Sequence, residues 1–237
     1  MNRPVSGRRC LAWSVLFLAG AVLATPLHGQ RGASDSARSS RVIAGIRGSG
    51  FSRAMVIGHG AGPLDALFAL SAVARDASGV LLVMLEPGGP AAHPVVVERA
   101  RTPADLGVHG VRFSPFLGTR DLIDVEITHQ PFMLETSRTF ISHHLLRRQG
   151  DALSLVCDLD GGSYSSFSKG IGSNTTTREV TITRVPGTAL IFTVRVVAKI
   201  VQQRDRASAP VVDSTISVKW YELPVVGPCR EVAARKL

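Results

Sequence analysis

Apolar and polar residues alternate over much of the second half of the chain. The clearest run is ALIFTVRVVAKIV (189–201), in which every second residue from Leu190 to Ile200 is apolar. Alternation of this length predicts a strand with one buried face. The run REVTITRV precedes it across Pro186 and Gly187, so the two segments predict a hairpin.

Two further segments follow the same rule and predict strands with an inward apolar face. In STISVKWYEL the inward residues are Ile216, Val218 and Trp220, with Lys219 outward. In DLIDVEITHQ the inward residues are Ile123, Val125 and Ile127.

A second hairpin is predicted where RTFISHHLLRRQ meets ALSLVCDLD at Gly150 and Asp151, a strong turn signal. Pairing across this turn places Cys157 on the more apolar face, toward the core. The same pairing places His143 beside Asp158 on the other face. The predicted apolar face contains Phe140, Ser142, His144 and Leu146 with Leu153, Leu155, Cys157 and Leu159.

The first third of the chain is more ambiguous. ALFALSAVARDASGVLLVMLEPG predicts a hairpin turning at DASG (76–79), where Gly79 suits a left-handed position. An alanine-rich helix over residues 64–75 is the alternative. HPVVVERA predicts a short strand, RTPADLGVHG a loop or one helical turn, and GHGAG (58–62) a turn between strands.

These segments amount to eight to ten strands separated by turns every 8–15 residues. We therefore predict an all-β fold, a single antiparallel β-sandwich or partly open β-barrel with little helix, over residues 41–237. Residues 25–40 are small and polar and predict a flexible lead-in. The glycine- and serine-rich stretch from Asp160 to Thr176 predicts a mobile connection.

The N-terminus carries three arginines, then an apolar run over residues 10–24, then TPLHGQ. This order predicts a secretory signal peptide over residues 1–24, with cleavage there or as late as residue 30. An uncleaved anchor is the alternative, although the run is short for a membrane span. No later segment is long and apolar enough to cross a bilayer, so we expect a secreted or periplasmic protein.

Composition and charge limit the classes of partner that the chain is expected to bind. The formal net charge is +9, but the basic residues are dispersed and aromatic residues make up 5% of the chain. Nucleic-acid binding requires aromatic platforms or a recognition helix, and neither is predicted. We therefore expect no nucleic-acid partner, and an envelope protein, a glycan or a small ligand instead.

Two cysteines remain once Cys10 leaves with the signal peptide. Cys157 and Cys229 would close a loop of about 70 residues, worth about 4 kcal/mol in the chain-entropy account of disulfides. An oxidising compartment permits this bridge. Two buried thiols are the alternative, and no Cys or His spacing near either residue indicates a metal site.

Candidate chemistry is sparse. His143 and Asp158 are the strongest catalytic candidates because a carboxylate can orient a histidine, and several serines lie nearby in the sequence. Asp158 and Asp160 begin DLDGG, which resembles the start of a calcium loop, but Lys169 occupies the twelfth position, where an EF-hand has glutamate. No nucleophile elbow, phosphate loop or dinucleotide motif occurs, so no cofactor is predicted.

Three functional hypotheses follow. The first is a non-catalytic binding or structural module of the periplasm or cell envelope. The second is a hydrolase that uses the His143 and Asp158 region. The third is a carrier whose barrel cavity would be lined by Leu155, Phe192, Val194, Val196 and Trp220.

Overall fold

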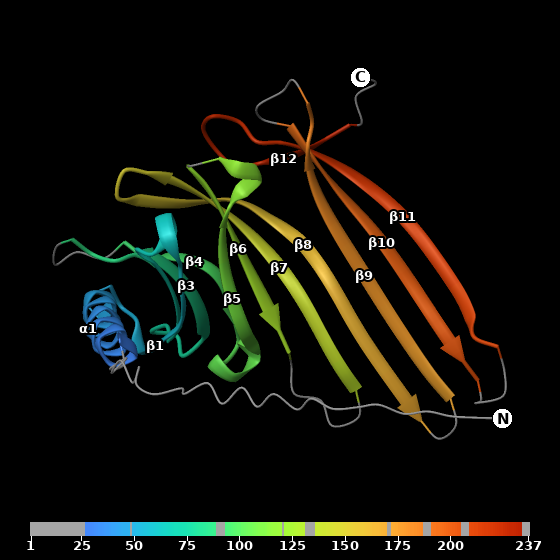
Figure 1. Ribbon diagram of the computed structural model, residues 1–237, viewed down its shortest axis with the longest axis horizontal. Helices are drawn as coiled ribbons and strands as arrows, with labels where there is room; N and C mark the ends of the chain where they lie inside the picture. The colour runs from blue at the N-terminus through green and yellow to red at the C-terminus, as the bar shows by residue number, and fades with distance from the viewer. Residues whose placement is uncertain are drawn as a thin grey trace, which may run out of the picture.

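In the described residues, the computed structural model consists of two antiparallel sheets, one α-helix and three short 3-10 helices, which confirms the predicted all-β class (Figure 1). The 3-10 helices are η1 (Gly62–Leu64), η2 (Pro103–Leu106) and η3 (Phe116–Gly118). The structure describes residues 27–47, 49–88, 93–119, 121–130, 136–169, 172–186, 191–204 and 209–233. The predicted signal peptide, residues 1–24, lies outside these ranges. No helix in the described ranges is long and apolar enough to span a membrane.

The small sheet has the order β1-β2-β3-β4 and the large sheet the order β12-β11-β10-β9-β8-β7-β6-β5. The strands of the small sheet are β1 (Ser52–His59), β2 (Leu67–Val73), β3 (Gly79–Leu85) and β4 (Val95–Ala100). Those of the large sheet are β5 (Val108–Pro115), β6 (Leu122–His129), β7 (Thr136–Gln149), β8 (Ala152–Lys169), β9 (Gly172–Arg184), β10 (Ile191–Gln203), β11 (Val211–Glu222) and β12 (Arg230–Val232).

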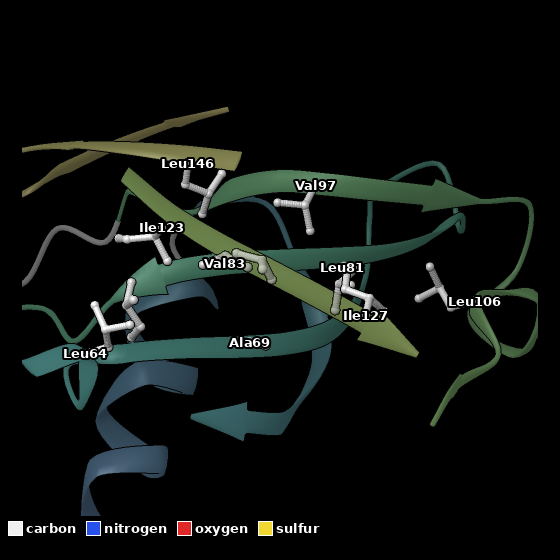
Figure 2. Close-up of a cluster of buried hydrophobic side chains, with 11 residues drawn as sticks. Leu64, Ala69, Leu81, Val83, Val97, Leu106, Ile123, Ile127 and Leu146 are labelled. Atoms are coloured by element: carbon white, nitrogen blue, oxygen red, sulfur yellow. The ribbon is translucent and has the colours of Figure 1, made fainter. Parts of the chain in front are cut away.

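The two central strands of the small sheet, β2 and β3, are buried on both faces. One face packs on β6 and β7 of the large sheet through a core that includes Leu81, Val83, Ile123, Ile127 and Leu146 (Figure 2). Helix α1 (Leu27–Arg47) packs on the other face. A strand covered on both sides must be apolar at nearly every position, which explains why β2 and β3 lack alternation.

The hairpin predicted in this ambiguous region is confirmed, because β2 pairs with β3 from Leu67 and Leu85 to Val73 and Gly79. The turn differs from the prediction. Ala77 takes the left-handed conformation, with φ of 64°, and Gly79 already begins β3. Asp76 supports this turn by accepting hydrogen bonds from the backbone and side chain of Ser78.

Helix α1 corrects the predicted flexible lead-in over residues 25–40. Val42 and Ile46 lie four residues apart on one helical face, and both are fully buried against the small sheet. Arg38 and Arg41 anchor the same helix by pairing with Glu86. Tertiary packing therefore stabilises a helix whose local sequence is small and polar.

The predicted mobile connection over residues 160–176 is wrong as well, because β8 and β9 run through it. A bulge at Gly161 and Gly162 interrupts the pairing of β8 with β7. A side chain at Gly161 would place its Cβ 2.2 Å from the carbonyl oxygen of Ile141, so only glycine fits there. The two glycines that resemble a loop signal are part of a strand.

Strands β8 and β9 of the large sheet separate on the N-terminal side of this bulge in β8. Pairing between β8 and β9 begins at Ser163 and Arg178. The end of β8 nearer the β7–β8 turn instead packs over β9 and β10, in a third core that includes Val156, Leu159, Phe192 and Val194.

The chain after β11 closes this part of the fold against β8. Cys157 and Cys229 form a disulfide, with their Cα atoms 5.2 Å apart. The backbone N–H of Cys229 also donates to the carbonyl oxygen of Val156 at 2.6 Å. The predicted pair of cysteines is thus brought together at the edge of the third core.

The opposite ends of β8 to β11 extend beyond the small sheet as a single layer, which we call the arm (Figure 1). The arm comprises residues 163–169, 172–178, 197–203 and 211–219, and none of its described side chains is buried. Ile216 and Val218, predicted to point inward, are 62% and 49% exposed. Their strand has the alternation of a one-sided sheet, but no second layer covers it among the described residues.

Candidate functional site

Five polar side chains meet between the two sheets, and we call them the inter-sheet cluster. Glu98 comes from β4 of the small sheet, and the other four come from the large sheet. They are His129 on β6, Ser142 and His144 on β7, and Asp158 on β8. These four residues lie at neighbouring positions on one face of the large sheet. Ser142 and His144, for example, are two residues apart on one strand and therefore point to the same side.

Glu98 is the centre of the cluster. Its Oε1 accepts hydrogen bonds from Ser142 Oγ at 2.7 Å, His144 Nε2 at 2.9 Å and His129 Nε2 at 3.0 Å. The second ring nitrogens also have acceptors. His144 Nδ1 donates to Asp158 Oδ1 at 2.7 Å, and His129 Nδ1 donates to the Leu106 carbonyl at 2.9 Å.

This arrangement favours the charged form of both histidines. Each ring faces an oxygen acceptor on both sides, an arrangement that favours a proton on both ring nitrogens and thus the imidazolium form. Burial by itself would lower the pKa of His129 and of His144, but hydrogen bonds to Glu98 and to the second acceptor raise both pKa values. His129 is further held by ring stacking on Phe140, with centroids 4.4 Å apart.

The pKa of Glu98 is shifted in the opposite direction, downward. Burial would raise the pKa of its carboxyl group, but hydrogen bonds from His129, His144 and Ser142 hold that pKa far below its ordinary value of 4.5. Glu98 and the two histidines therefore stabilise each other's charged forms in a largely buried setting, while the Asp158 side chain, 64% exposed, lies at the margin of the cluster. Such a network stabilises the contact between the sheets only while every member keeps its partner.

Ser142, His144 and Asp158 also have the spacing of a catalytic triad. Ser142 Oγ lies 3.1 Å from His144 Nε2, and His144 Nδ1 lies 2.7 Å from Asp158. A triad histidine must accept the serine proton at Nε2. Here that nitrogen donates to Glu98, and the serine hydroxyl also donates to Glu98. The base position is thus occupied by a proton.

The structure separates the two residues that the sequence paired. His143 faces Asp124, with Nδ1 3.0 Å from each carboxylate oxygen, and its backbone pairs with Leu159. Asp158 pairs with His144 instead. The hairpin starts in the predicted register, with Leu146 opposite Leu155, but an extra residue at Val156 shifts the pairing by one and exchanges the faces.

The calcium candidates are also placed differently from a metal site. Asp158 bonds His144 while its side chain is 64% exposed, and the Asp160 backbone pairs with Ser142. In the described part of the chain, no three His, Cys, Asp or Glu residues are grouped so that they could hold a metal ion.

The residues suggested for a carrier cavity do not surround one space. Phe192, Val194 and Val196 are buried in the third core, whereas Leu155 packs against the core between the sheets. Phe192 does border a cavity of about 20 Å³, which is room for about one water molecule.

A larger open groove, of about 560 Å³, lies where β8 and β9 separate. His143, Glu126 and Tyr164 contribute to its lining from the β7 side, and Arg178 and Glu179 from β9. Neither this groove nor the cavity at Phe192 is lined by Ser142, His144 or Glu98.

Sequence reasoning missed the inter-sheet cluster, although part of its signal was present. The alternation in β6 that gives Ile123, Val125 and Ile127 continues to His129, so a histidine occupies an inward position. The predicted apolar face of β7 likewise contains Ser142 and His144. Polar residues on a predicted core face require partners, but only the structure identifies Glu98 as the shared acceptor.

Comparison of the chain with family models, with curated proteins and with solved structures finds no match.

Proposed function

We propose that this chain is an exported, non-catalytic protein-binding module and that the arm is its interaction surface. The observation that carries the proposal is the exposure of nine consecutive residues, Val211–Lys219, in a strand that is rich in valine and isoleucine. The basic, then apolar N-terminal sequence supports export.

Exposed apolar surface of this kind is costly in isolation. Val211, Val212, Ile216 and Val218 are each about half exposed or more, and they lie together on one strand. Contiguous apolar patches on soluble proteins commonly mark interaction sites. Covering these four side chains with a partner would contribute roughly 1 kcal/mol each.

The inter-sheet cluster supports a non-catalytic role. A general base needs a free lone pair, and His144 directs both ring N–H groups to carboxylates. The Ser142 hydroxyl donates its hydrogen bond to Glu98, so it is directed to that carboxylate and not to His144. The cluster therefore serves to hold β4 against β6 and β7.

Site-specific photocrosslinking in the cell that makes the protein tests this function. A photoreactive side chain at Ile216 should give discrete protein adducts, because that position is 62% exposed on the arm. The same side chain at Met55, which is 61% exposed on β1, is the matched control and should give none. Equal adducts at both positions, or none at either, would contradict the proposal.

A serine hydrolase is the second candidate, because Ser142, His144 and Asp158 are connected in series at 3.1 and 2.7 Å. A fluorophosphonate probe labels an activated serine. We expect no labelling of the native protein above that of Ser142→Ala. Labelling that disappears in Ser142→Ala would establish the hydrolase and exclude the non-catalytic account.

A further inference from the structure

We propose that the open groove between β8 and β9 is a binding site for a neutral sugar, which it holds through the sugar's hydroxyl groups. The groove lies at the base of the arm, has a volume of about 560 Å³ and is lined by residues of β6, β7, β8 and β9. This site does not depend on the protein partner proposed for the arm. Three acceptor side chains, one aromatic ring and a near balance of charge support it.

Strand pairing brings much of the polar lining of the groove to one face of the large sheet. His143 on β7 lies directly opposite Glu126 on β6. Thr139 lies four residues before His143 on the same face, and it is opposite Tyr164 on β8. Glu179 lines the groove from β9, which has already separated from β8 at this position. Side chains from four strands therefore surround one space.

His143 is held so that one ring nitrogen remains available to a ligand. Its Nδ1 donates to the carboxylate of Asp124, 3.0 Å from each oxygen. Its side chain is only 14% exposed, and its Nε2 has no partner among the described residues. No buried polar side-chain atom in the described ranges lacks a partner, so this Nε2 must reach solvent. The solvent-filled space that His143 lines is the groove.

Two carboxylates also leave acceptor oxygens open to the groove. Glu126 Oε2 accepts a hydrogen bond from Arg112 at 2.6 Å, whereas its Oε1 has no partner in the part of the chain that the structure describes. The exposed carboxylate of Glu179 has neither a hydrogen bond nor an ion pair with any described residue. Ionised carboxylates only accept hydrogen bonds. A ligand that fits these groups must therefore supply several donors.

The charges around the groove nearly cancel, which favours a neutral ligand. Arg112 pairs with Glu126, and Arg178 lines the groove together with Glu179. An ammonium group would satisfy the carboxylates, but it would also meet the positive charge of both arginines. A hydroxyl group is uncharged and both donates and accepts. It can therefore bond the carboxylates and the Nε2 of His143 in either protonation state of that ring.

Tyr164 gives the groove an apolar side. It is 43% exposed and lines the groove together with Ile141 and Val180. An aromatic ring can cover the apolar C–H face of a sugar, while the hydroxyl groups at the edge of the sugar reach polar side chains. Small-molecule sites have volumes of about 300–1,000 Å³, and the groove lies within this range. A sugar combines the hydroxyl donors and the apolar face that this lining requires.

NMR titration of the full chain with neutral sugars tests the proposal. The probes are maltose, cellobiose, lactose and N-acetylglucosamine, each added to about 50 mM so that weak binding is detected. At least one sugar should give saturable shifts of the backbone amides of Tyr164 and Glu179. The amide of Met55, on β1 and outside the groove, should not shift.

Substitutions of exposed lining residues locate the binding. Glu179→Gln should weaken the affinity at least about tenfold, because a neutral amide replaces a charged acceptor. Tyr164→Ala should weaken it about fivefold or more through loss of the ring. Asp151→Asn is the matched control, since it removes an exposed acid of the β7–β8 turn that does not line the groove. This control should bind as the native protein does.

Three results would overturn the proposal. The first is the absence of saturable shifts with all four sugars. The second is unchanged affinity in both Glu179→Gln and Tyr164→Ala, which would place the sugar elsewhere. The third is binding of cadaverine, a diamine, without binding of any sugar, which would make the groove a cation site. Photocrosslinking at Ile216 is unaffected by all three results, so the proposed function of the arm is tested separately.

Discussion

The two ends of β10 differ in burial although their sequence pattern is the same. Phe192, Val194 and Val196 are buried in the third core, whereas Ala198 is half-buried and Ile200 is 36% exposed. The alternation continues from one end to the other, and what changes is the layer that covers the strand. Alternation therefore reports that a face can be buried, and the neighbouring layers decide whether it is.

Removing the disulfide is expected to give the largest loss of stability, in the third core where one end of β10 is buried. Replacing Cys157 and Cys229 together by serine should lower the free energy of unfolding by about 4 kcal/mol, since the bridge closes a separation of 72 residues. Urea denaturation measures this loss, with the reduced native protein as the control. No loss would show that the third core is stable without the tether.

A matched pair of isoleucines compares the two regions directly. Ile123 is fully buried between the sheets and Ile216 is 62% exposed on the arm, and both belong to the large sheet. Ile123→Ala should cost about 3 kcal/mol of unfolding free energy. Ile216→Ala should cost less than about 0.5 kcal/mol in dilute solution. Similar costs would mean that the arm is covered in the folded monomer.

Glu98 tests whether the inter-sheet cluster holds the covered region together. Glu98→Gln removes the charge shared by His129 and His144 and should cost about 2 kcal/mol, because the two buried rings lose their common partner. Histidine NMR titration should then show a lower pKa for both rings. Unchanged stability together with unchanged titration would refute the network.

The pH dependence is the smallest of these effects. The pKa of each of the two histidines is raised in the folded state, so their stabilisation is complete below the ordinary value of 6.5 and is lost as pH rises through the folded pKa. Glu98 has a lowered pKa, so its contribution is present above 4.5 and is lost as pH falls.

The two sets of groups together define a stability maximum on the mildly acidic side. Unfolding measured from pH 4 to pH 9 should therefore show greatest stability between about 4.5 and 6.5, with a decline toward alkaline pH. The matched control is Glu98→Gln, in which this alkaline decline should be much smaller. The same decline in both proteins would assign it to other groups.

Local patterns predicted the strands well where one face is covered. β6 shows the predicted alternation of buried Ile123, Val125 and Ile127, and the β9–β10 hairpin forms as expected. The β2–β3 hairpin also forms as the sequence predicts, in place of the alternative helix. These strands and hairpins form between segments that are adjacent in the sequence, so the local pattern of apolar residues is enough to predict them.

The errors come from interactions that a local pattern does not record. One extra residue at Val156 moved Asp158 from the side of His143 to that of His144, a change that periodicity alone does not reveal. Helix α1 depends on burying Val42 and Ile46 against a sheet formed later in the chain. Glu98 lies on a short strand far from its partners in sequence, so its role required the packing of two sheets.

The central claim is that the outer edge of β11 is open in the monomer and becomes covered on binding. Residue-resolved amide hydrogen exchange tests this claim most directly. In the isolated protein, every second amide between Val211 and Val218 should exchange rapidly while those of β6 are protected. Protection of every amide from Val211 to Val218 would contradict the account, because it would mean that the edge is already paired within one chain.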